Sequence, residues 1–386
     1  MSDDTASERV ADERFADEET LLELVNPLKL SLRHQLGVLG LVALGLLPLG
    51  VEPITVLKLT GALYFAMFAM SWDAVSGYTG QISFGQGIFF AAGGYTSALL
   101  NTTYGLDPLV TIAAGVVVAA IAGVVIGVPA LRLKGPYLSL VTLVAPLILL
   151  QVFIIESDTF GGELGLPSPD SVLGFDPTAN YYLAYGLFVA ILVVLLAVTR
   201  SDAGAVFTAI REDEDAVAAV GLNPAKFKTF AFVLSAAVGG LAGGFFVHSP
   251  VGNPSPSQLF TLTVNIEVII AAILGGMGTI VGAALGGLFL VLFRDFLANQ
   301  DVVIPLLGVP ISDVDFLLFS LVALVLLFVF PGGLLRWGIG AGRRVLARLS
   351  GGAVATDGGR GPSPAEREPA ERVEPSGRDS SGGERR

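Results

Sequence analysis

Long apolar stretches alternate with short polar connections along most of the chain. The apolar stretches cover about residues 34–50, 53–75, 87–101, 107–130, 137–155, 181–199, 229–247, 263–275, 278–297 and 314–331. A helix needs roughly 17–25 mostly apolar residues to cross a hydrocarbon core of about 30 Å. Most stretches satisfy this, and the short one at 263–275 cannot join the next, because a helix of about 50 Å would result at about 1.5 Å per residue. The pattern predicts an all-α, polytopic transmembrane bundle of about ten spans.

The basic residues predict the orientation of these spans. Lys and Arg cluster in residues 29–33, 132–134, 200–228 and 336–348. Cytoplasmic loops carry an excess of Lys and Arg, and even numbers of predicted crossings separate the four clusters. One orientation therefore places all four clusters and both termini in the cytoplasm. Lys58 and Arg294 oppose the rule, since each would lie in the outer half of its span, unless it reaches the outer interface or a boundary differs.

The two ends of the chain differ from its middle. Acidic residues dominate the start of the chain, and its end is a mixture of Gly, Ser, Pro, Glu and Arg. Such segments bury too little apolar surface to offset the entropy lost on ordering. We expect disordered tails at 1–30 and 346–386 and a transmembrane domain at 31–345. The net charge of −12 suits a high-salt cytoplasm, although the two acidic tails alone would also explain it.

A polar helix is predicted in residues 200–228, here called the interlude. Asp202 is a suitable N-cap, the helix would run from Ala203 to Val220, and Gly221 would end it. Helices that lie on lipid favour Lys and Arg on their polar face, whereas this one has four consecutive acids. The interlude therefore favours docking with a second protein. One face would hold Val206, Ile210, Val217 and Val220, and the opposite face Arg211, Glu212 and Asp215.

Glycine interrupts the apolar pattern at two related places. Residues 76–95 contain six glycines, and Gly77-x-x-Gly80-x-Ile82 is echoed by Gly275-x-x-Gly278-x-Ile280. Glycine allows close backbone packing, or local unwinding that exposes backbone groups to a cavity. Paired interruptions in two halves of a transporter indicate a pathway near the midplane, whereas a cytoplasmic turn and chance similarity are the alternatives. Structural roles are expected for Gly77, Gly80, Gly85, Gly275, Gly276 and Gly278, and pathway roles for Tyr78, Gln81, Ser83 and Gln86.

Two acidic residues fall within the predicted spans. Asp73 closes the second apolar stretch, and Glu267 lies in the short one. A carboxylate in hydrocarbon is costly unless it is paired, neutralised or hydrated, so it is a candidate functional group. We include Glu267 in the candidate substrate pathway, with a hydrated carboxylate near the outer end of its helix as the alternative. His248 follows a span and is interpreted as an exposed imidazole.

The chain offers little material for enzymatic chemistry. It has no cysteine and two histidines, and it lacks a nucleotide-binding loop, a paired His/Glu metal motif and a nucleophile elbow. We therefore expect neither an enzyme nor a bound cofactor or metal. Any work driven by ATP would have to come from another chain.

Several motifs occur in one collinear order between Leu57 and Leu335. They are GYTGQISFG at 77–85, LRLKGPY at 131–137, AIREDE at 209–214, NIE at 265–267, LGGMGT at 274–279 and FPGGL at 330–334. In these motifs the chain resembles the permease subunits of branched-chain amino acid ABC importers, of the LivM type. The resemblance implies an integral-membrane permease that moves branched-chain amino acids across the plasma membrane.

The resemblance also implies how the permease is driven and with what it assembles. The interlude would be the coupling loop, with an E-A-A-x-x-x-G signature that here has Asp215 in place of Glu and Val217 in place of the second Ala. The implied partners are two ATP-binding cassette ATPase subunits, a second homologous permease, an extracytoplasmic substrate-binding protein and the lipid bilayer, without nucleic acid. The implied coupling residues are Arg211, Glu212, Glu214, Asp215, Ala216 and Gly221.

Three alternatives to this function remain. Permeases of similar sequence carry urea and short amides, so the substrate could belong to that class. An ion-coupled secondary carrier would need pairs of acidic residues within the membrane, and only Asp73 and Glu267 are candidates. The third alternative is a scaffold without transport. Copurification of a stoichiometric ATPase with this chain would support an ABC permease. Uptake by this chain alone, driven by an ion gradient, would support a secondary carrier.

Overall fold

The computed structural model describes residues 32–130, 137–300, 303–304, 309–310, 314–330 and 332–349. The chain divides into two units, Met1–Gly342 and Arg343–Arg386. The predicted N-terminal tail, nearly all of the predicted C-terminal tail and the basic cluster at 132–134 lie outside the described residues.

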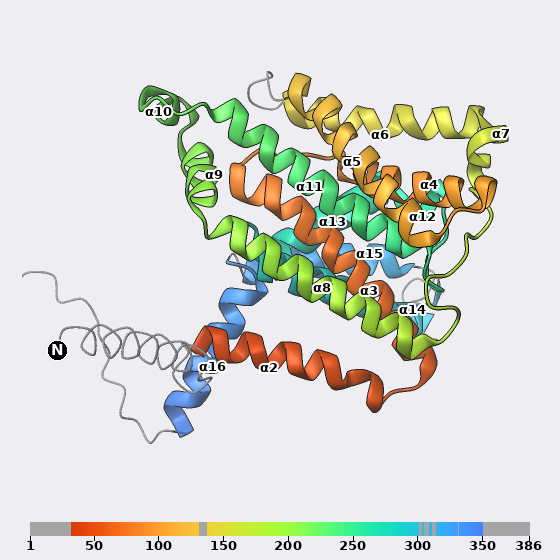
Figure 1. Ribbon diagram of the computed structural model, residues 1–386. Coiled ribbons are helices and arrows are strands. Elements are labelled where there is room, and N and C mark those ends of the chain that lie inside the picture. Colours follow the sequence, from red (N-terminus) through yellow and green to blue (C-terminus); the bar gives the residue numbers. More distant parts are fainter. Residues whose placement is uncertain are drawn as a thin grey trace, which may run out of the picture. The chain divides into compact units, whose positions relative to one another are not determined.

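The first unit is a bundle of α-helices, and each predicted apolar stretch forms one of them (Figure 1). The long helices are α2 (Leu32–Leu46), α3 (Pro53–Trp72), α4 (Gln86–Tyr104), α5 (Pro108–Ala130), α6 (Tyr137–Ile155), α8 (Pro177–Thr199), α9 (Asp202–Glu212), α11 (Pro224–Val247), α13 (Leu262–Gly276), α14 (Ile280–Ala298), α15 (Asp315–Val329) and α16 (Gly333–Leu349). The short elements are η1 (Leu47–Leu49), the π-helical turn η2 (Asp73–Gly77), α7 (Ser157–Phe160), η3 (Gly162–Leu164), α10 (Glu214–Ala219), α12 (Pro256–Leu259) and the antiparallel pair β1 (Val303–Ile304) and β2 (Val309–Pro310).

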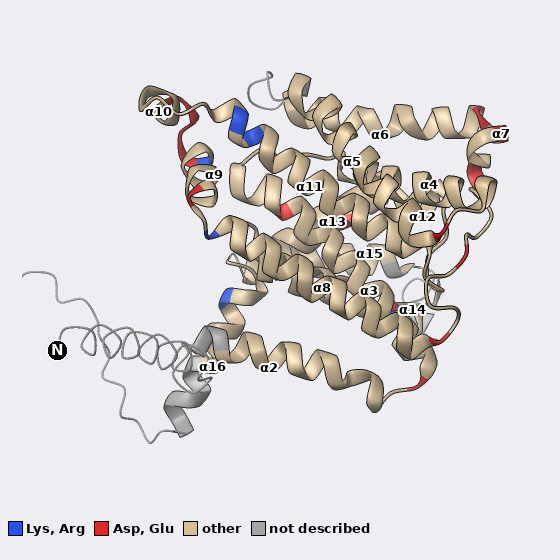
Figure 2. Cartoon of the chain, viewed as in Figure 1, with Lys and Arg blue, Asp and Glu red and all other residues tan. Residues whose placement is uncertain are grey.

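Seven helical segments of the described chain are long and apolar enough to cross a membrane. They are Pro53–Gly77, Pro108–Pro129, Tyr137–Ile155, Pro177–Thr199, Pro224–Val247, Pro256–Gly276 and Ile280–Ala298. An eighth results if Phe316–Val329 and Gly333–Gly342, bent by 57°, form one broken span. The fold is thus helical and contains several membrane-spanning candidates, while the predicted number of about ten spans stays a prediction. Among the described residues, Figure 2 shows most charged positions near the ends of the helices.

The interior of the bundle is built around α3, α11 and α13. In each of these spans, more than half of the most apolar 18-residue stretch is buried inside the protein. The corresponding share is 28% for α5 and 22% for α6. The outward faces of these peripheral helices carry exposed apolar residues such as Val125 and Ile148. That pattern places α5 and α6 at the periphery of the bundle and α3, α11 and α13 among other helices.

Small residues let α4, α5 and α11 approach one another closely. A Cβ atom at Gly93 would collide with the backbone of Gly240, and one at Gly115 would lie 3.2 Å from the Cα of Gly93. Membrane helices gain association energy from such packing, because lipid removes the hydrophobic drive that acts between helices in water. The glycines therefore fix the spacing of the three helices.

The interlude forms two helices, which corrects the prediction of one continuous helix. The chain leaves the helical conformation at Asp213 (φ −157°, ψ 103°), and the carboxylate of Asp213 accepts a hydrogen bond from the Ala216 amide at 3.0 Å. Asp is a favoured N-cap residue because its side chain satisfies an amide that the helix leaves unpaired. At the first helix, Ser201 occupies the N-cap position and Asp202 is already helical.

The apolar face of the interlude is shorter than predicted. Ile210 and Val217 are buried and Val206 is partly buried, whereas 76% of Val220 is exposed. The break at Asp213 changes the helix direction, so a wheel drawn through both helices places the last residues incorrectly. Gly221 ends the second helix as predicted, with φ +88°, a conformation that glycine adopts at little cost.

Candidate functional site

The two glycine interruptions of the sequence meet in the folded protein. The first break comprises residues 73–85, between the end of α3 and the start of α4, and the second break comprises residues 276–279, between α13 and α14. Oδ1 of Asp73 accepts a hydrogen bond from the Gly278 amide at 2.7 Å. A Cβ atom at Gly77 would lie 2.7 Å from the same amide nitrogen. Glycine at position 77 therefore permits direct backbone contact between the breaks.

Arg211 of the interlude contacts both breaks. Its Nη1 donates a hydrogen bond to the carbonyl oxygen of Gly77 at 2.7 Å, and a Cβ atom at Gly278 would lie 2.6 Å from Nη1. Gly80, with φ +72°, packs against the aliphatic stem of Arg211. The sequence interpretation placed Arg211 on an outward charged face. That interpretation is wrong for its guanidinium, which reaches inward to the breaks.

An ion pair holds the other end of the interlude. Nζ of Lys228 lies 2.7 Å from Oε1 of Glu214, and only 4% of the Lys228 side chain is exposed. A buried ammonium needs such a partner because desolvation is costly. Glu214 thus links α10 to the start of α11. Of the remaining predicted coupling residues, Glu212, Asp215 and Ala216 lie at the exposed surface, where Figure 2 shows acidic residues along α9 and α10.

The first break is folded by its own polar side chains. Nε1 of Trp72 donates to the Ser83 carbonyl at 2.7 Å, and Oγ of Ser76 donates to the Gln81 carbonyl at 3.0 Å. Ser83 in turn donates its amide to Oγ of Ser76. These bonds satisfy backbone groups of Gln81 and Ser83, which lie outside the helices and would otherwise lack partners. Ser83 is buried, Gln81 and Tyr78 are partly buried, and Gly85 is enclosed.

Gln86 lies in a buried polar network at the centre of the bundle. Its Nε2 donates to Oγ of Ser71 at 2.9 Å and to Oγ of Ser235 at 2.7 Å. Ser235 also donates to the Ser71 carbonyl at 2.6 Å. Gln86 is 1% exposed, so in this conformation it joins α3, α4 and α11 and faces no open passage. Sequence reasoning missed Ser71 and Ser235, whose signal was a single hydroxyl within an apolar stretch.

Asn265 attaches the start of α4 to α13. Its Oδ1 accepts a hydrogen bond from the Gly87 amide at 2.7 Å, and its Nδ2 donates to the Thr261 carbonyl. A Cβ atom at Gly87 would lie 2.8 Å from Nδ2 of Asn265. The contact brings the NIE motif next to the glycine-rich segment, which the sequence order alone did not reveal.

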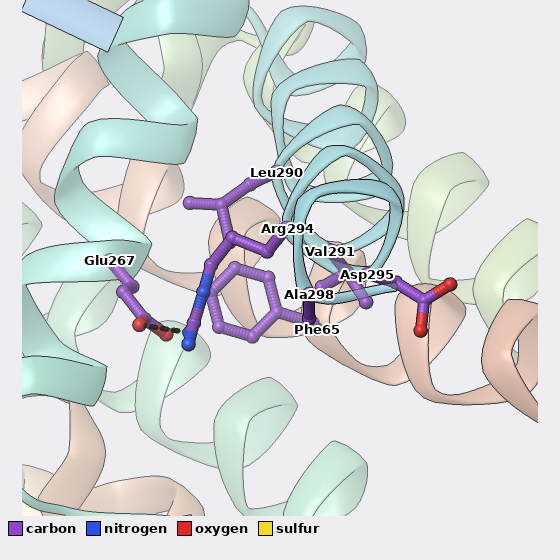
Figure 3. Close-up of a pocket in the computed structure, with 7 residues that line it drawn as sticks. All are labelled: Phe65, Glu267, Leu290, Val291, Arg294, Asp295 and Ala298. Atoms are coloured by element: carbon purple, nitrogen blue, oxygen red, sulfur yellow. Dashed lines mark hydrogen bonds and ion pairs between the residues drawn. The ribbon is translucent and has the colours of Figure 1, made fainter. Parts of the chain in front are cut away.

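Glu267 is buried and paired. Its Oε1 lies 2.5 Å from Nη1 of Arg294, and Figure 3 shows the two side chains pointing toward each other from α13 and α14. The carboxylate is 8% exposed, so the alternative of a hydrated Glu267 is wrong for this conformation. Next to the pair is a pocket of about 270 Å³ lined by Phe65, Glu267, Leu290, Val291, Arg294, Asp295 and Ala298.

The two cations that opposed the predicted orientation both have acidic partners. Arg294 pairs with Glu267, and Nζ of Lys58 lies 2.9 Å from the carboxylate of Asp295. Arg294 and Asp295 are neighbours in sequence, and Figure 3 shows their side chains extending in different directions. Pairing lowers the cost of placing these charges in a span. The orientation of the spans and their boundaries stay predictions.

His248 is buried rather than exposed, which corrects its interpretation. It is 1% exposed, its Nδ1 lies 2.6 Å from the Asp170 carbonyl, and its Nε2 lies 2.7 Å from Oγ of Ser97. Because a carbonyl only accepts, Nδ1 carries a proton and donates it to Asp170. Burial lowers the pKa of His248, and the hydrogen bond to Asp170 and nearby carboxylates oppose this effect.

Comparisons with known proteins place these features in context. The family model described as the branched-chain amino acid transport system / permease component matches residues 54–331. The permease protein LivM of Salmonella typhimurium is 31% identical over 268 residues, which cover 62% of this chain and 63% of that protein. Thus the chain spans slightly less than two thirds of this relative's length. No solved structure matches the chain.

An archaeon supplies two further relatives. In Methanocaldococcus jannaschii, the probable branched-chain amino acid permease LivM is 28% identical over 66% of this chain and 78% of that protein. The probable permease LivH of the same organism is 26% identical over 53% of this chain and 68% of that protein. These matches confirm the resemblance seen in the motifs. Since the family model matches well over half of the sequence, the chain belongs to the permease components of branched-chain amino acid transport systems.

Proposed function

We propose that the chain is the transmembrane permease subunit of an ATP-binding cassette importer in the plasma membrane. It moves branched-chain amino acids, and separate ATPase subunits hydrolyse the ATP. The observation that supports this most directly is the interlude, which is anchored to the bundle by Arg211 and by the Glu214–Lys228 pair. An anchored helix transmits a push, whereas a loosely attached helix would move without moving the spans.

The ATPase docks on the exposed side of the interlude in this proposal. Glu212, Asp215 and Ala216 provide the docking surface, while Gly221 ends the second helix and sets its length. Arg211 and Glu214 act on the permease side, because their charged groups contact the bundle. The interlude and both termini lie in the cytoplasm, and about ten crossings complete the topology.

The other proposed partners are a second permease and an extracytoplasmic substrate-binding protein. Similarity of this chain to both LivM and LivH of one organism supports a pair of homologous permeases. The two permeases pair with two ATPase subunits, and the binding protein delivers substrate on the opposite side of the membrane. The lipid bilayer surrounds the peripheral helices, and the importer needs no nucleic acid.

We further propose that substrate passes along the first break and toward Glu267. Tyr78, Gln81, Ser83 and Gln86 offer polar groups near the breaks. Glu267 lies nine residues before Gly276 in α13, which corresponds to about 14 Å at about 1.5 Å per residue. Because Gln86 is enclosed by Ser71 and Ser235 in this conformation, passage requires α3, α4 and α11 to separate there.

The proposal is tested by reconstitution of the complex that copurifies with this chain. Proteoliposomes with ATP inside the cytoplasmic compartment and loaded binding protein outside should accumulate leucine, isoleucine or valine. Empty vesicles and vesicles with a non-hydrolysable ATP analogue are the controls. Concentrative uptake by this chain alone, driven by an ion gradient, would contradict the proposal.

The same assay separates the substrate classes. Urea and short amides are tested beside the branched-chain amino acids, with each competing against labelled leucine. Uptake of urea without uptake of leucine would reassign the substrate within the family. The ion-coupled alternative loses support because Glu267 has Arg294 as a partner and the Asp73 carboxylate accepts the Gly278 amide.

A further inference from the structure

We propose that Asp73 and Arg211 join the interlude to both breaks, so that one push moves the two together. This inference rests on the proposed function and names the residues that would transmit force. The group formed by Asp73, Gly77, Arg211 and Gly278 is called the break contact. It connects α9, the end of α3 and the start of α14, which are far apart in the sequence.

The break contact uses the side chains of Arg211 and Asp73 to hold backbone groups. Arg211 donates to the Gly77 carbonyl, and the carboxylate of Asp73 accepts the Gly278 amide, both at 2.7 Å. The guanidinium of Arg211 is always charged, and hydrogen bonds with a charged partner are about twice as strong as neutral ones. Because backbone groups are bound, a displacement of Arg211 acts on the path of the chain itself. A contact between two side chains could instead be absorbed by a change of rotamer.

The second bond lies where α14 begins. Gly278 precedes the N-cap residue Thr279, and amides at the start of a helix have no partner within that helix. The partial positive charge of a helix N-terminus favours an anion such as the Asp73 carboxylate. Asp73 is fully buried, so water does not compete for this bond. The carboxylate therefore fixes α14 to the end of α3.

Tight packing leaves the break contact little freedom. A Cβ atom at Gly77 would lie 2.7 Å from the Gly278 amide, and one at Gly278 would lie 2.6 Å from Nη1 of Arg211. Gly80 likewise permits the stem of Arg211 to pass at 3.2 Å from its Cβ position. Well-packed contacts transmit displacement because they cannot compress. The three glycines thus leave the space that these close contacts require, because they have no Cβ atom.

Buried apolar residues of α9 hold this helix, and with it Arg211, against the bundle. Phe207 and Ile210 are buried, and Phe207 belongs to an apolar cluster with Val75 of η2 and Phe232 of α11. This cluster keeps α9 against the bundle even when the hydrogen bond of Arg211 is removed. An Arg211→Ala variant should therefore fold and assemble, which makes transmission separable from folding.

The test measures ATP hydrolysis and uptake in the same reconstituted complex. Arg211→Ala should keep assembly and hydrolysis within about twofold of wild type, while uptake per ATP falls about tenfold or more, as expected for loss of one charged hydrogen bond. Arg211→Lys should recover part of the uptake, since an ammonium can still donate to the Gly77 carbonyl. Thr208→Ala is the matched control on α9, where the hydroxyl bonds only within the helix.

Asp73 provides the second arm of the experiment. Asp73→Asn retains an oxygen that can accept the Gly278 amide and should keep more uptake per ATP than Asp73→Ala. In the double variant Asp73→Asn/Arg211→Ala, the loss of uptake per ATP should be smaller than the combined losses of the two single variants. The reason is that both residues act through one contact. Additive losses would mean that the two residues act separately and would overturn the proposal.

A cysteine reporter distinguishes transmission from a purely structural role. The native chain has no cysteine, so Ser83→Cys, at a buried position in the first break, introduces a single thiol. Labelling by a membrane-permeant thiol reagent should accelerate during ATP turnover in the otherwise wild-type complex and stay constant with Arg211→Ala. A similar ATP response in both would overturn the proposal.

Two further outcomes are decisive. If Arg211→Ala prevents the ATPase from binding, Arg211 is a docking residue and the proposed transmission is wrong. If the wild-type complex shows no ATP-dependent uptake, the proposed function fails, and the break contact loses its role with it. Normal uptake per ATP in both Arg211→Ala and Asp73→Ala would reject the break contact alone.

Discussion

At the residue scale, the charged groups inside the bundle are explained by their partners. Glu267 and Arg294 form one pair, and Lys58 and Asp295 form another. The pairs differ in burial, because the Glu267 carboxylate is 8% exposed and that of Asp295 is 35% exposed. This difference lets the two pairs be compared within one protein.

We expect Glu267→Ala to destabilise the protein more than Asp295→Ala. Removal of one partner from a buried pair costs about 3–5 kcal/mol, and partial exposure of Arg294 should reduce this to about 2 kcal/mol. Loss of the more exposed pair should cost about 1 kcal/mol or less. The midpoint of thermal unfolding in one detergent measures both. Equal shifts would mean that burial does not govern these pairs.

His248 predicts a dependence of stability on pH. Burial lowers its pKa in the folded protein, so the unfolded chain binds a proton more readily. The stability that the neutral imidazole contributes is present above the unfolded pKa of about 6.5 and is lost as the pH falls below it. The unfolding midpoint should decrease between about pH 7.5 and pH 5.5. His248→Gln should weaken this decrease, and an unchanged slope would exclude His248 as its source.

At the element scale, the interlude shows how one residue changes a helix into two. Local periodicity predicted a single helix from Ala203 to Val220, yet the chain breaks at Asp213. Asp at that position can cap a new helix, and the break directs both Ile210 and Val217 toward the bundle. Tertiary burial therefore outweighed the continuous helical pattern.

Loss of the Asp213 cap should loosen the second helix alone. Asp213→Ala removes the acceptor for the Ala216 amide, and loss of such a cap costs about 0.5–2 kcal/mol. Hydrogen exchange should accelerate in α10 and remain unchanged in α11. Asp202→Ala is the matched control, because no side-chain cap bond is formed at the start of α9. Equal acceleration in both variants would contradict the assigned cap.

At the scale of the whole molecule, small residues determine which helices meet. The close contact of α4 with α11 at Gly93 and Gly240 holds the centre of the bundle together. Apolar side chains alone would not select these neighbours, since lipid offers an equally apolar surface. The arrangement of α3, α4 and α11 in turn encloses Gln86.

Gly93→Ala should separate α4 from α11 and destabilise the protein. The added methyl group would meet the Gly240 backbone, which cannot change rotamer, and overpacking of this kind costs about 1–3 kcal/mol. The control is Gly61→Ala on α3, where a Cβ atom meets nothing within 4 Å and alanine favours the helix by up to about 1 kcal/mol. We expect the midpoint of thermal unfolding to fall for Gly93→Ala and not for Gly61→Ala.

Much of the helical fold could be predicted because its signals are local. Each long apolar stretch became a helix, and Gly221 and the run at 275–278 interrupted helices where expected. The number of spans and the orientation stay predictions, because length and composition support seven segments of the described chain. The family followed from collinear motifs and is confirmed by the comparisons.

The site was only partly predictable, because its contacts join residues distant in sequence. The glycine pattern indicated that the two breaks correspond, but it could not show that Asp73 reaches Gly278. A helical wheel placed Arg211 outward, since it considers one helix and omits the carbonyl of Gly77. Ser71 and Ser235 carried no motif, so their bonds to Gln86 could not be foreseen.

The amino-acid sequence by itself determined the apolar helices, their glycine interruptions and the membership of a permease family. The helices and their interruptions depend on the length of each apolar stretch and on the backbone freedom of glycine, and both are properties of residues close together in the sequence. Only the tertiary structure decided which charged and polar groups are partners, because burial and direction emerge when helices pack. Arg211 illustrates the difference, since its charge is evident in the sequence and its carbonyl partner is supplied by the fold.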